Sequence, residues 1–184
     1  MGRYTLEIMN GERAERLFKA TAEVEGYSVT KSSKYINMAE HIDFYLKSMS
    51  GLYDFSVDVK SRKKSERSSH WYADQEVWVE FHNVKGADGW LYGEADKIAF
   101  ERVNDFIIVP REALAKLCEK IVIPRFVHTA GEALYHIYQR KGRKDVISKI
   151  LMTDIIKEIE NIMYWNKIDE ELQPSSKKTD NKKK

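Results

Sequence analysis

The chain has 184 residues, of which 42% are hydrophobic and 33% are charged, so it is long enough and apolar enough to fold around a buried core. Its formal net charge of +2 excludes a protein that is strongly basic or acidic throughout. No apolar run has the length of a membrane span, no signal-peptide or myristoylation pattern is found, and Cys118 is the single cysteine. We therefore expect a globular, cytoplasmic protein without a membrane partner, an internal disulfide or a cysteine-rich zinc site.

A helix is predicted over residues 11–25, followed by a turn and a loop over residues 26–33. Glu15 lies at the edge of the apolar face of this helix. A carboxylate in that position would overlook a pocket under the helix, although most such acids are ordinary flanking charges. The face itself is formed at helical spacing by Ala14, Leu17, Phe18, Thr21 and Ala22.

Two strands are predicted next, over residues 41–46 and in the first part of residues 53–64. In both, apolar residues alternate with polar ones, which is the period of a half-buried strand. The polar face of the first strand carries Asp43, and that of the second carries Asp58 and Lys60. A short turn separates the strands, so we expect an antiparallel hairpin that brings the two aspartates close together. Two carboxylates on adjacent strands are a common site for a hard cation.

Three further strands are predicted, over residues 77–81, 97–100 and 106–109. The last of them is apolar on both faces, which is typical of a central strand. The first of them carries Glu80 on its polar face, together with Glu76, Trp78 and His82. A helix over residues 111–122 follows, with its leucines and isoleucine on one face.

After Pro124, apolar residues recur at helical spacing as far as Met163, so a helical C-terminal extension is predicted over residues 126–172. Residues 173–184 are polar and rich in lysine, and we expect them to be disordered. The predicted organisation is therefore an α/β core over residues 1–125, a helical extension packed on that core, and a tail.

Basic residues are concentrated in three places along the chain. Local basic patches fit a polyanionic partner, whereas for the tail alone we favour a role in solubility. The three groups are Lys60, Arg62, Lys63, Lys64 and Arg67; Arg140, Lys141, Arg143 and Lys144; and Lys177, Lys178, Lys182, Lys183 and Lys184. The candidate nucleic-acid contacts are Arg62, Lys63, Lys64, Arg67, Lys85 and Trp90, and the last would stack on a base or cover the core.

Sequence motifs of several other enzyme classes are missing. None of the five histidines pairs at HExxH spacing, and the chain has no Walker loop, no GxGxxG after a strand and no GxSxG. Cys118 lies within an apolar helical pattern, which argues against a nucleophilic role.

The acids follow one another in a recognisable order. Glu15 on a first helix, Asp43 on a strand and Asp58-Val59-Lys60 on the next strand resemble the PD-(D/E)xK nuclease superfamily, and the helix glutamate is most similar to its Holliday-junction-resolvase-like branch. The resemblance covers roughly residues 10–125. The segments VWVEFHNVKGADGWLYGEADKIAFE and YQRKGRKD are also similar to those of small phage-type proteins with this core. One departure is that Ile42 stands where the family usually has proline.

This resemblance implies a restriction-endonuclease-like fold, with a mixed β-sheet core flanked by helices. It implies a Mg²⁺- or Mn²⁺-dependent endonuclease that hydrolyses DNA, branched or junction DNA included, and that acts as a homodimer. The metal would be held by Asp43, Asp58 and the Val59 carbonyl, with Glu15 and Glu80 as further ligands, and Lys60 would position or activate the attacking water. The basic residues after Lys60 would bind phosphates without sequence choice.

Two other functions remain open on the sequence alone. One is a nucleic-acid-binding module on the same fold without cleavage, which metal-dependent nicking of plasmid DNA would distinguish. The other is a structural or assembly protein that uses the C-terminal helices as its partner surface, which predicts a tight oligomer and no affinity for DNA.

Overall fold

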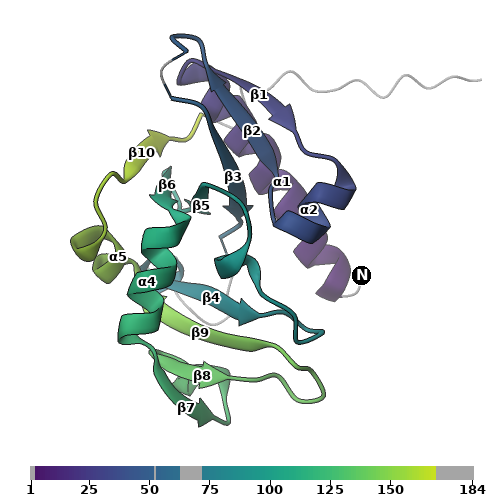
Figure 1. Ribbon diagram of the computed structural model, residues 1–184, viewed down its shortest axis with the longest axis vertical. Helices are drawn as coiled ribbons and strands as arrows, with labels where there is room; N and C mark the ends of the chain where they lie inside the picture. The colour runs from purple at the N-terminus through teal and green to yellow at the C-terminus, as the bar shows by residue number, and fades with distance from the viewer. Residues whose placement is uncertain (1–2, 52, 63–71, 169–184) are drawn as a thin grey trace, which may run out of the picture.

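The computed structural model describes residues 3–51, 53–62 and 72–168, and Figure 1 shows it as a mixed α/β protein with two sheets. None of the described helices is both long and apolar enough to cross a membrane. In chain order the elements are α1 (Arg3–Val24), β1 (Tyr27–Lys31), α2 (Lys34–Glu40), β2 (Phe44–Ser48), β3 (Phe55–Lys60), α3 (Tyr72–Gln75), β4 (Glu76–His82), the 3₁₀ turn η1 (Trp90–Tyr92), β5 (Lys97–Glu101), β6 (Asp105–Pro110), α4 (Arg111–Ile121), β7 (Ile123–Val127), the 3₁₀ turn η2 (Ala130–Glu132), β8 (His136–Tyr138), β9 (Val146–Leu151), α5 (Met152–Glu158) and β10 (Met163–Asn166).

The central sheet has six strands in the order β1-β2-β3-β5-β6-β10. The strands β3 and β5 run parallel, and Asp58 pairs with Ile98 and Lys60 with Phe100, while the other neighbours are antiparallel. Parallel neighbours end at the same edge of a sheet. The carboxyl ends of β3 and β5 therefore lie side by side, and this edge carries the site described below.

The helix α1 covers one face of the central sheet, as Figure 1 shows. Its predicted apolar face is confirmed, because Leu17 is 1% exposed and Phe18 is fully buried. Phe18 stacks against Phe44 of β2 and Trp165 of β10, and meets Phe106 of β6 edge-on. Aromatic contacts of this kind add to the free energy of simple area burial. The helix thus fastens the hairpin strand and the last strand to one core.

The other face of the central sheet is covered by a second core. There Ile98 and Ile107 of the central sheet pack with Leu91 of η1, Leu114 of α4 and Ile150 of β9, all fully buried. The second sheet, with the order β4-β9-β8-β7, is part of this layer. Because layers cover both faces, the strand β3 is buried on both sides, and the prediction of a half-buried strand is wrong.

Most elements before residue 122 agree with the sequence prediction. The antiparallel hairpin of β2 and β3, the strands β4, β5 and β6, and the helix α4 are confirmed. β6 lies between β5 and β10, as expected for a strand that is apolar on both faces. β1 occupies part of the predicted loop 26–33, because pairing with β2 makes a strand of a mostly exposed edge segment that has no clear period of its own.

The predicted helical extension over residues 126–172 is wrong, because the described part of this segment consists mainly of strands and turns with the short helix α5. Val146 and Ile150 are four residues apart, a spacing that puts two side chains on one face of a strand as well as of a helix. Tertiary pairing selected the strand, because β9 pairs with β4 along its whole length, with Lys149 opposite Trp78.

This segment is also not an addition to a finished core. The predicted boundary at residue 125 falls inside β7, β9 completes the sheet that β4 begins, and β10 pairs with β6 in the central sheet. The predicted disordered tail 173–184 lies outside the described residues.

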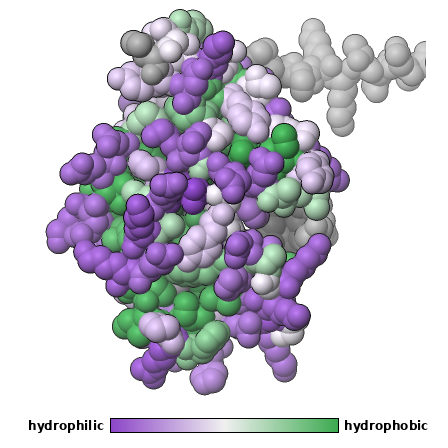
Figure 2. Space-filling model, viewed as in Figure 1, coloured by the Kyte–Doolittle hydropathy of each residue, from purple (hydrophilic) through white to green (hydrophobic). Residues whose placement is uncertain are grey.

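Hydrophilic side chains cover most of the face seen in Figure 2, and the hydrophobic ones at its lower end lie over the second sheet, where Phe126 of β7 is 61% exposed.

Candidate functional site

Asp43 and Asp58 meet at the hairpin of β2 and β3, as the sequence predicts. The backbone N–H of Asp43 donates to the carbonyl of Val57 at 2.9 Å, and its carboxylate oxygen Oδ2 accepts from the N–H of Val59 at 2.7 Å. Asn37 of α2 donates a further, short hydrogen bond to Asp43. Asp43 is 5% exposed and Asp58 4%, so both carboxyl groups are buried. We call these two residues the acid pair.

Burial dominates the electrostatics of the acid pair. Burial, followed by the nearby charge of Asp58, raises the pKa of Asp43 to about 6 against the opposing hydrogen bond from Val59. Burial also raises the pKa of Asp58, although the Lys60 ammonium opposes this shift. Raised pKa values in two buried acids indicate that the positive charge nearby does not fully compensate both carboxylates.

Lys60 supplies the one close cation of the acid pair among the described residues. Its ammonium nitrogen lies 2.6 Å from Asp58 Oδ2 and 4.7 Å from the centre of the Trp90 ring. Apart from this contact with Lys60, Asp58 Oδ2 is buried without a hydrogen-bond partner among the described residues. Trp90 is 8% exposed and belongs to the second core, which favours the predicted role of core cover over that of a stacking surface.

His41 and Glu80 stand around this group. His41 ends α2 with a left-handed backbone at φ 56°. Burial lowers the pKa of its imidazole, the charge of Lys60 lowers it further, and Glu80 and Asp43 act in the opposite direction. His41 was not among the residues predicted for the site, although the alternation of residues 41–46 already placed it on the same strand face as Asp43.

Glu15 does not join the acid pair. Its carboxylate accepts from the Lys31 ammonium at 2.7 Å, and this hydrogen bond, with the charges of Glu15 and Asp43, raises the pKa of Lys31. The negative charges of Glu15 and Asp43 thus both act on the Lys31 ammonium. Among the described residues, no group of three or more histidine, cysteine, aspartate or glutamate side chains is arranged to hold a metal ion.

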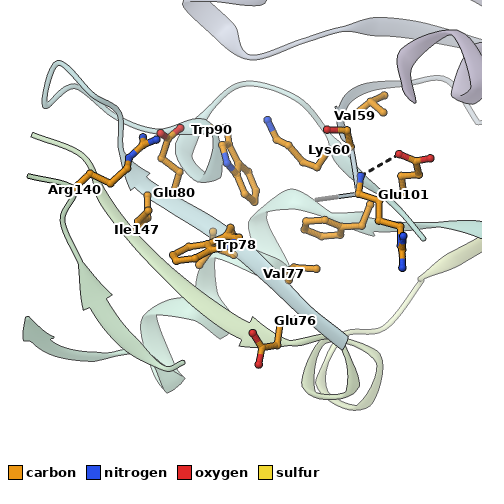
Figure 3. Close-up of a pocket in the computed structure, with 14 residues that line it drawn as sticks. Val59, Lys60, Glu76, Val77, Trp78, Glu80, Trp90, Glu101, Arg140 and Ile147 are labelled. Atoms are coloured by element: carbon orange, nitrogen blue, oxygen red, sulfur yellow. Dashed lines mark hydrogen bonds between the residues drawn. The ribbon is translucent and has the colours of Figure 1, made fainter. Parts of the chain in front are cut away.

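A cavity of about 260 Å³ lies between the two sheets and is bordered by Val59 and Lys60 at the end of β3, but not by Asp43 or Asp58 themselves. Figure 3 shows its walls, with Lys60 pointing toward Trp90 and with Glu80 and Arg140 pointing toward one another at one end. Trp78 of β4 forms part of the opposite wall. Gly89 lets the η1 turn approach β4 closely, because a Cβ there would lie 2.3 Å from the Glu80 carbonyl oxygen.

A second buried acid, Glu101 at the end of β5, lines the same cavity, and its surroundings were missed by the sequence analysis. Its side chain is 1% exposed, and Arg13 Nη2 donates to both of its oxygens at 2.6 and 2.7 Å. Lys167 Nζ and the backbone N–H of Arg62 each donate at 3.0 Å. Burial alone would raise the pKa of Glu101, but these donors outweigh it and hold the pKa below its ordinary value. We call these four residues the Glu101 cluster.

Arg62 is part of this framework and does not present its guanidinium to a phosphate. Its side chain is 9% exposed, and Nε lies 2.5 Å from Asp74 Oδ1. The predicted role of Arg62 as a nucleic-acid contact therefore has no support in the structure. Lys63, Lys64 and Arg67, predicted with it, lie outside the described residues.

Other basic residues gather on the loops near Arg140, which lines the cavity. Lys85 is exposed on the turn after β4, and the N–H of Lys144 donates to the carbonyl of Val84 at 3.3 Å, so this turn packs against the β8–β9 connection. Asp145, which is fully buried, holds Arg140 through a short ion pair to Nε. These basic residues lie on two loops, the turn after β4 and the β8–β9 connection, and we call them together the basic loop pair: Lys85, Arg140, Lys141, Arg143 and Lys144.

Comparison with known proteins adds no relative. No protein-family model matches the chain, and neither a curated protein nor a solved structure matches it. The geometry of the acid pair, the cavity and the basic loop pair is therefore the basis for assigning a function.

Proposed function

We propose that the protein is a metal-dependent endonuclease that hydrolyses DNA phosphodiester bonds and has the restriction-endonuclease-like fold. The observation that carries the proposal is the acid pair, buried at the end of β3 with Lys60 Nζ 2.6 Å from Asp58. The order of the elements supports the proposal, since a helix precedes two antiparallel strands that carry the acids and a parallel strand follows in a mixed sheet.

The acid pair has the chemistry of a site for Mg²⁺ or Mn²⁺. Asp43 and Asp58 would hold the ion, with the carbonyl of Val59 as a further ligand and Glu80 as an acid at the cavity side. The fit rests on two buried carboxylates with raised pKa values and on Asp58 Oδ2, which has no hydrogen-bond partner among the described residues apart from the Lys60 ammonium. When bound, such an ion stabilises negative charge on a scissile phosphate and lowers the pKa of a coordinated water. Glu15, which is paired with Lys31, would act on it only from a distance.

The residues of the chain have separate tasks in this scheme. The Val59 N–H fixes the orientation of Asp43 through its hydrogen bond to Oδ2. Lys60, held between Asp58 and the face of Trp90, is positioned to donate a hydrogen bond to the attacking water or to a phosphate oxygen. An ammonium held in place before the substrate arrives needs little reorganisation during the reaction.

The basic loop pair supplies the electrostatic contact with DNA. Its exposed lysines and arginines lie at the end of the cavity that Arg140 lines, and the adjoining turns hold them together. Such side chains neutralise backbone phosphates and release counterions, which gives affinity without sequence choice. The same role is proposed for Lys63, Lys64 and Arg67, which lie outside the described residues.

One observation favours a second function, a DNA-binding module without cleavage. Lys60 already neutralises Asp58 directly at 2.6 Å, so the two side chains also form a complete ion pair without any added cation. The assembly function loses its main argument, because the C-terminal helices on which it depended are mostly strands.

The test is cleavage of a panel of linear, nicked, flapped and four-way-junction DNAs in Mg²⁺, Mn²⁺ or EDTA. We expect cleavage with either metal and none with EDTA. Metal-independent DNA binding without any cleavage would replace the nuclease proposal with the binding module. The absence of both binding and cleavage would exclude both functions.

A further inference from the structure

The cavity between the two sheets has a composition of its own, distinct from that of the acid pair. Apolar and aromatic side chains make much of its surface, among them Val77, Trp78, Phe100 and Ile147. Its volume of about 260 Å³ is close to the lower end of the range for small-ligand sites, which is about 300 Å³. A flat, partly apolar group with polar edges fits these walls better than a bare phosphate does.

Some polar groups of the cavity are already bound to other protein groups, whereas those at its far end can contact a ligand. The carboxylate of Glu101 is satisfied by Arg13 and Lys167, so it contributes structure and not recognition. At the far end, Glu80 offers carboxylate oxygens, and Arg140, held through Nε by Asp145, keeps its other guanidinium donors toward the cavity side. Acceptors and donors placed side by side match the Watson–Crick or Hoogsteen edge of a nucleobase.

An aromatic wall is the second requirement for a nucleobase. Trp78 lines the cavity from the middle of β4, where pairing with Lys149 of β9 fixes the backbone. It is only partly buried, and its ring lies 6.3 Å from that of Tyr138, which steadies it from the β8 side. The Lys149 ammonium lies over the indole, 5.4 Å from the ring centre, so a base would stack on the part of the indole that borders the cavity, in the way that unpaired bases use aromatic side chains.

We propose that this cavity binds one unpaired nucleobase of the DNA substrate, stacked on Trp78 and contacted at its edge by Glu80 and Arg140. The inference rests on the proposed nuclease function and narrows its substrate class. Lys60 forms part of the cavity wall and contacts Asp58, so this one side chain links a base held in the cavity to the acid pair. The preferred substrate is therefore DNA with a nucleotide out of the stack, such as a bulge, a flap or a branch point.

The test uses two DNA duplexes that differ in one position. In one, 2-aminopurine is an unpaired bulge, and in the other the same base is paired with thymine. Binding is measured with the full-length protein in EDTA, so that no strand is cut. We expect the bulged duplex to bind about tenfold more tightly and its 2-aminopurine fluorescence to be quenched on binding.

Two variants separate stacking from simple loss of structure. Trp78→Ala should remove the preference for the bulge and the quenching while leaving affinity for the paired duplex unchanged. Ile147→Phe fills the cavity with an apolar ring and should have the same effect in a protein whose thermal melt confirms folding. The matched control is Tyr164→Ala, an aromatic residue that is 52% exposed on β10, away from the cavity, and it should change neither quantity.

Several outcomes would overturn the inference. Equal affinity for the two duplexes, unquenched 2-aminopurine, or equal losses on both duplexes in Trp78→Ala would each exclude a base in this cavity. If the protein cleaves DNA with Mg²⁺ but shows one of these results, the nuclease proposal survives and the cavity proposal fails. If 2-aminopurine is quenched selectively in the bulged duplex but no metal supports cleavage, the cavity proposal survives and the nuclease proposal fails.

Discussion

Two buried acidic clusters lie at the same edge of the central sheet, because the parallel strands β3 and β5 end side by side. The acid pair at the end of β3 has two carboxylates and one close cation, Lys60. The Glu101 cluster at the end of β5 has one carboxylate and donors from two basic side chains and a backbone N–H. Burial acts on both, but it raises the pKa values of the acid pair, whereas the donors hold that of Glu101 low.

The difference shows what each cluster is suited to do. A buried carboxylate whose donors are all present is electrostatically complete, and it fixes the elements that supply them, here α1, β5 and the segment after β10. A buried pair with too little positive charge holds protons more tightly than usual and gains from an added cation. We therefore assign structure to the first arrangement and chemistry to the second.

The largest expected effect comes from breaking the acid pair. Asp58→Asn should reduce metal-dependent cleavage at least about a hundredfold, because an amide oxygen holds a divalent ion less well than a carboxylate. DNA binding should survive or improve, since one negative charge near the phosphates is gone. Lys60→Ala should lose most cleavage by a different route, through the loss of the donor to water or phosphate.

Single-turnover cleavage with thermal melts measures both variants. The matched control is Asp54→Asn, the same change at an exposed position of the same hairpin, and it should leave cleavage intact. Wild-type activity in a folded Asp58→Asn protein would end the nuclease assignment.

The Glu101 cluster should respond in stability and not in chemistry. Glu101→Gln leaves Arg13 and Lys167 without their shared carboxylate, and removing one partner of a buried ion pair costs about 3 kcal/mol. The control is Glu23→Gln, whose side chain is 51% exposed beside Lys19, and it should cost less than about 0.5 kcal/mol. Urea denaturation gives both values. Equal losses in the two variants would contradict the assignment of a structural role to Glu101.

The stabilisation of the folded protein by a divalent cation should depend on pH, because the cation and a proton compete for the acid pair. The pKa of Asp43 is raised from 3.8 to about 6, so the folded state binds its proton more tightly than the unfolded state. Without metal, the contribution of Asp43 to stability therefore falls as pH rises from about 4 to about 6. A divalent cation must compete with that proton at pH 5 and not at pH 8, so its apparent affinity should be about tenfold lower at pH 5.

Thermal melts with and without Mn²⁺ at the two pH values measure this difference. The increase in melting temperature should be larger at pH 8 than at pH 5, and Asp43→Asn should lose most of the difference. An increase that is the same at both pH values in the wild-type protein would show that Asp43 is not a ligand.

The smallest effect is expected at the basic loop pair. Lys141→Gln, Arg143→Gln and Lys144→Gln should each lower the slope of log affinity against log salt concentration by about one unit if each contacts one phosphate. The control is Lys116→Gln, an exposed lysine on α4, which should leave the slope unchanged. Unchanged slopes in all three variants would identify these loops as solvated surface, and DNA affinity would then have to come from elsewhere.

How far the sequence predicted the site is best seen in two sets of residues. Asp43, Asp58 and Lys60 come together as predicted, because Asp43 immediately precedes β2 and the other two lie on β3, and a short turn joins these adjacent strands. The partners of Glu101 were not found, because Arg13 is 88 residues away in the chain and Lys167 is 66 residues away. No local period links such residues, and only the packing of α1 and β10 against the sheet brings them together.

By itself the sequence determined the local elements with one strong period: the buried face of α1, the hairpin of β2 and β3, and the helix α4. Tertiary structure decided the segment after residue 122, where apolar residues four apart fit a helix and a strand equally well and pairing with β4 and β6 selected the strands. It also decided the burial of Asp58, because a polar strand face becomes buried only when a second layer covers it. The physical reason is the same in each case: the competing local conformations differ little in free energy, so long-range burial and hydrogen bonding select among them.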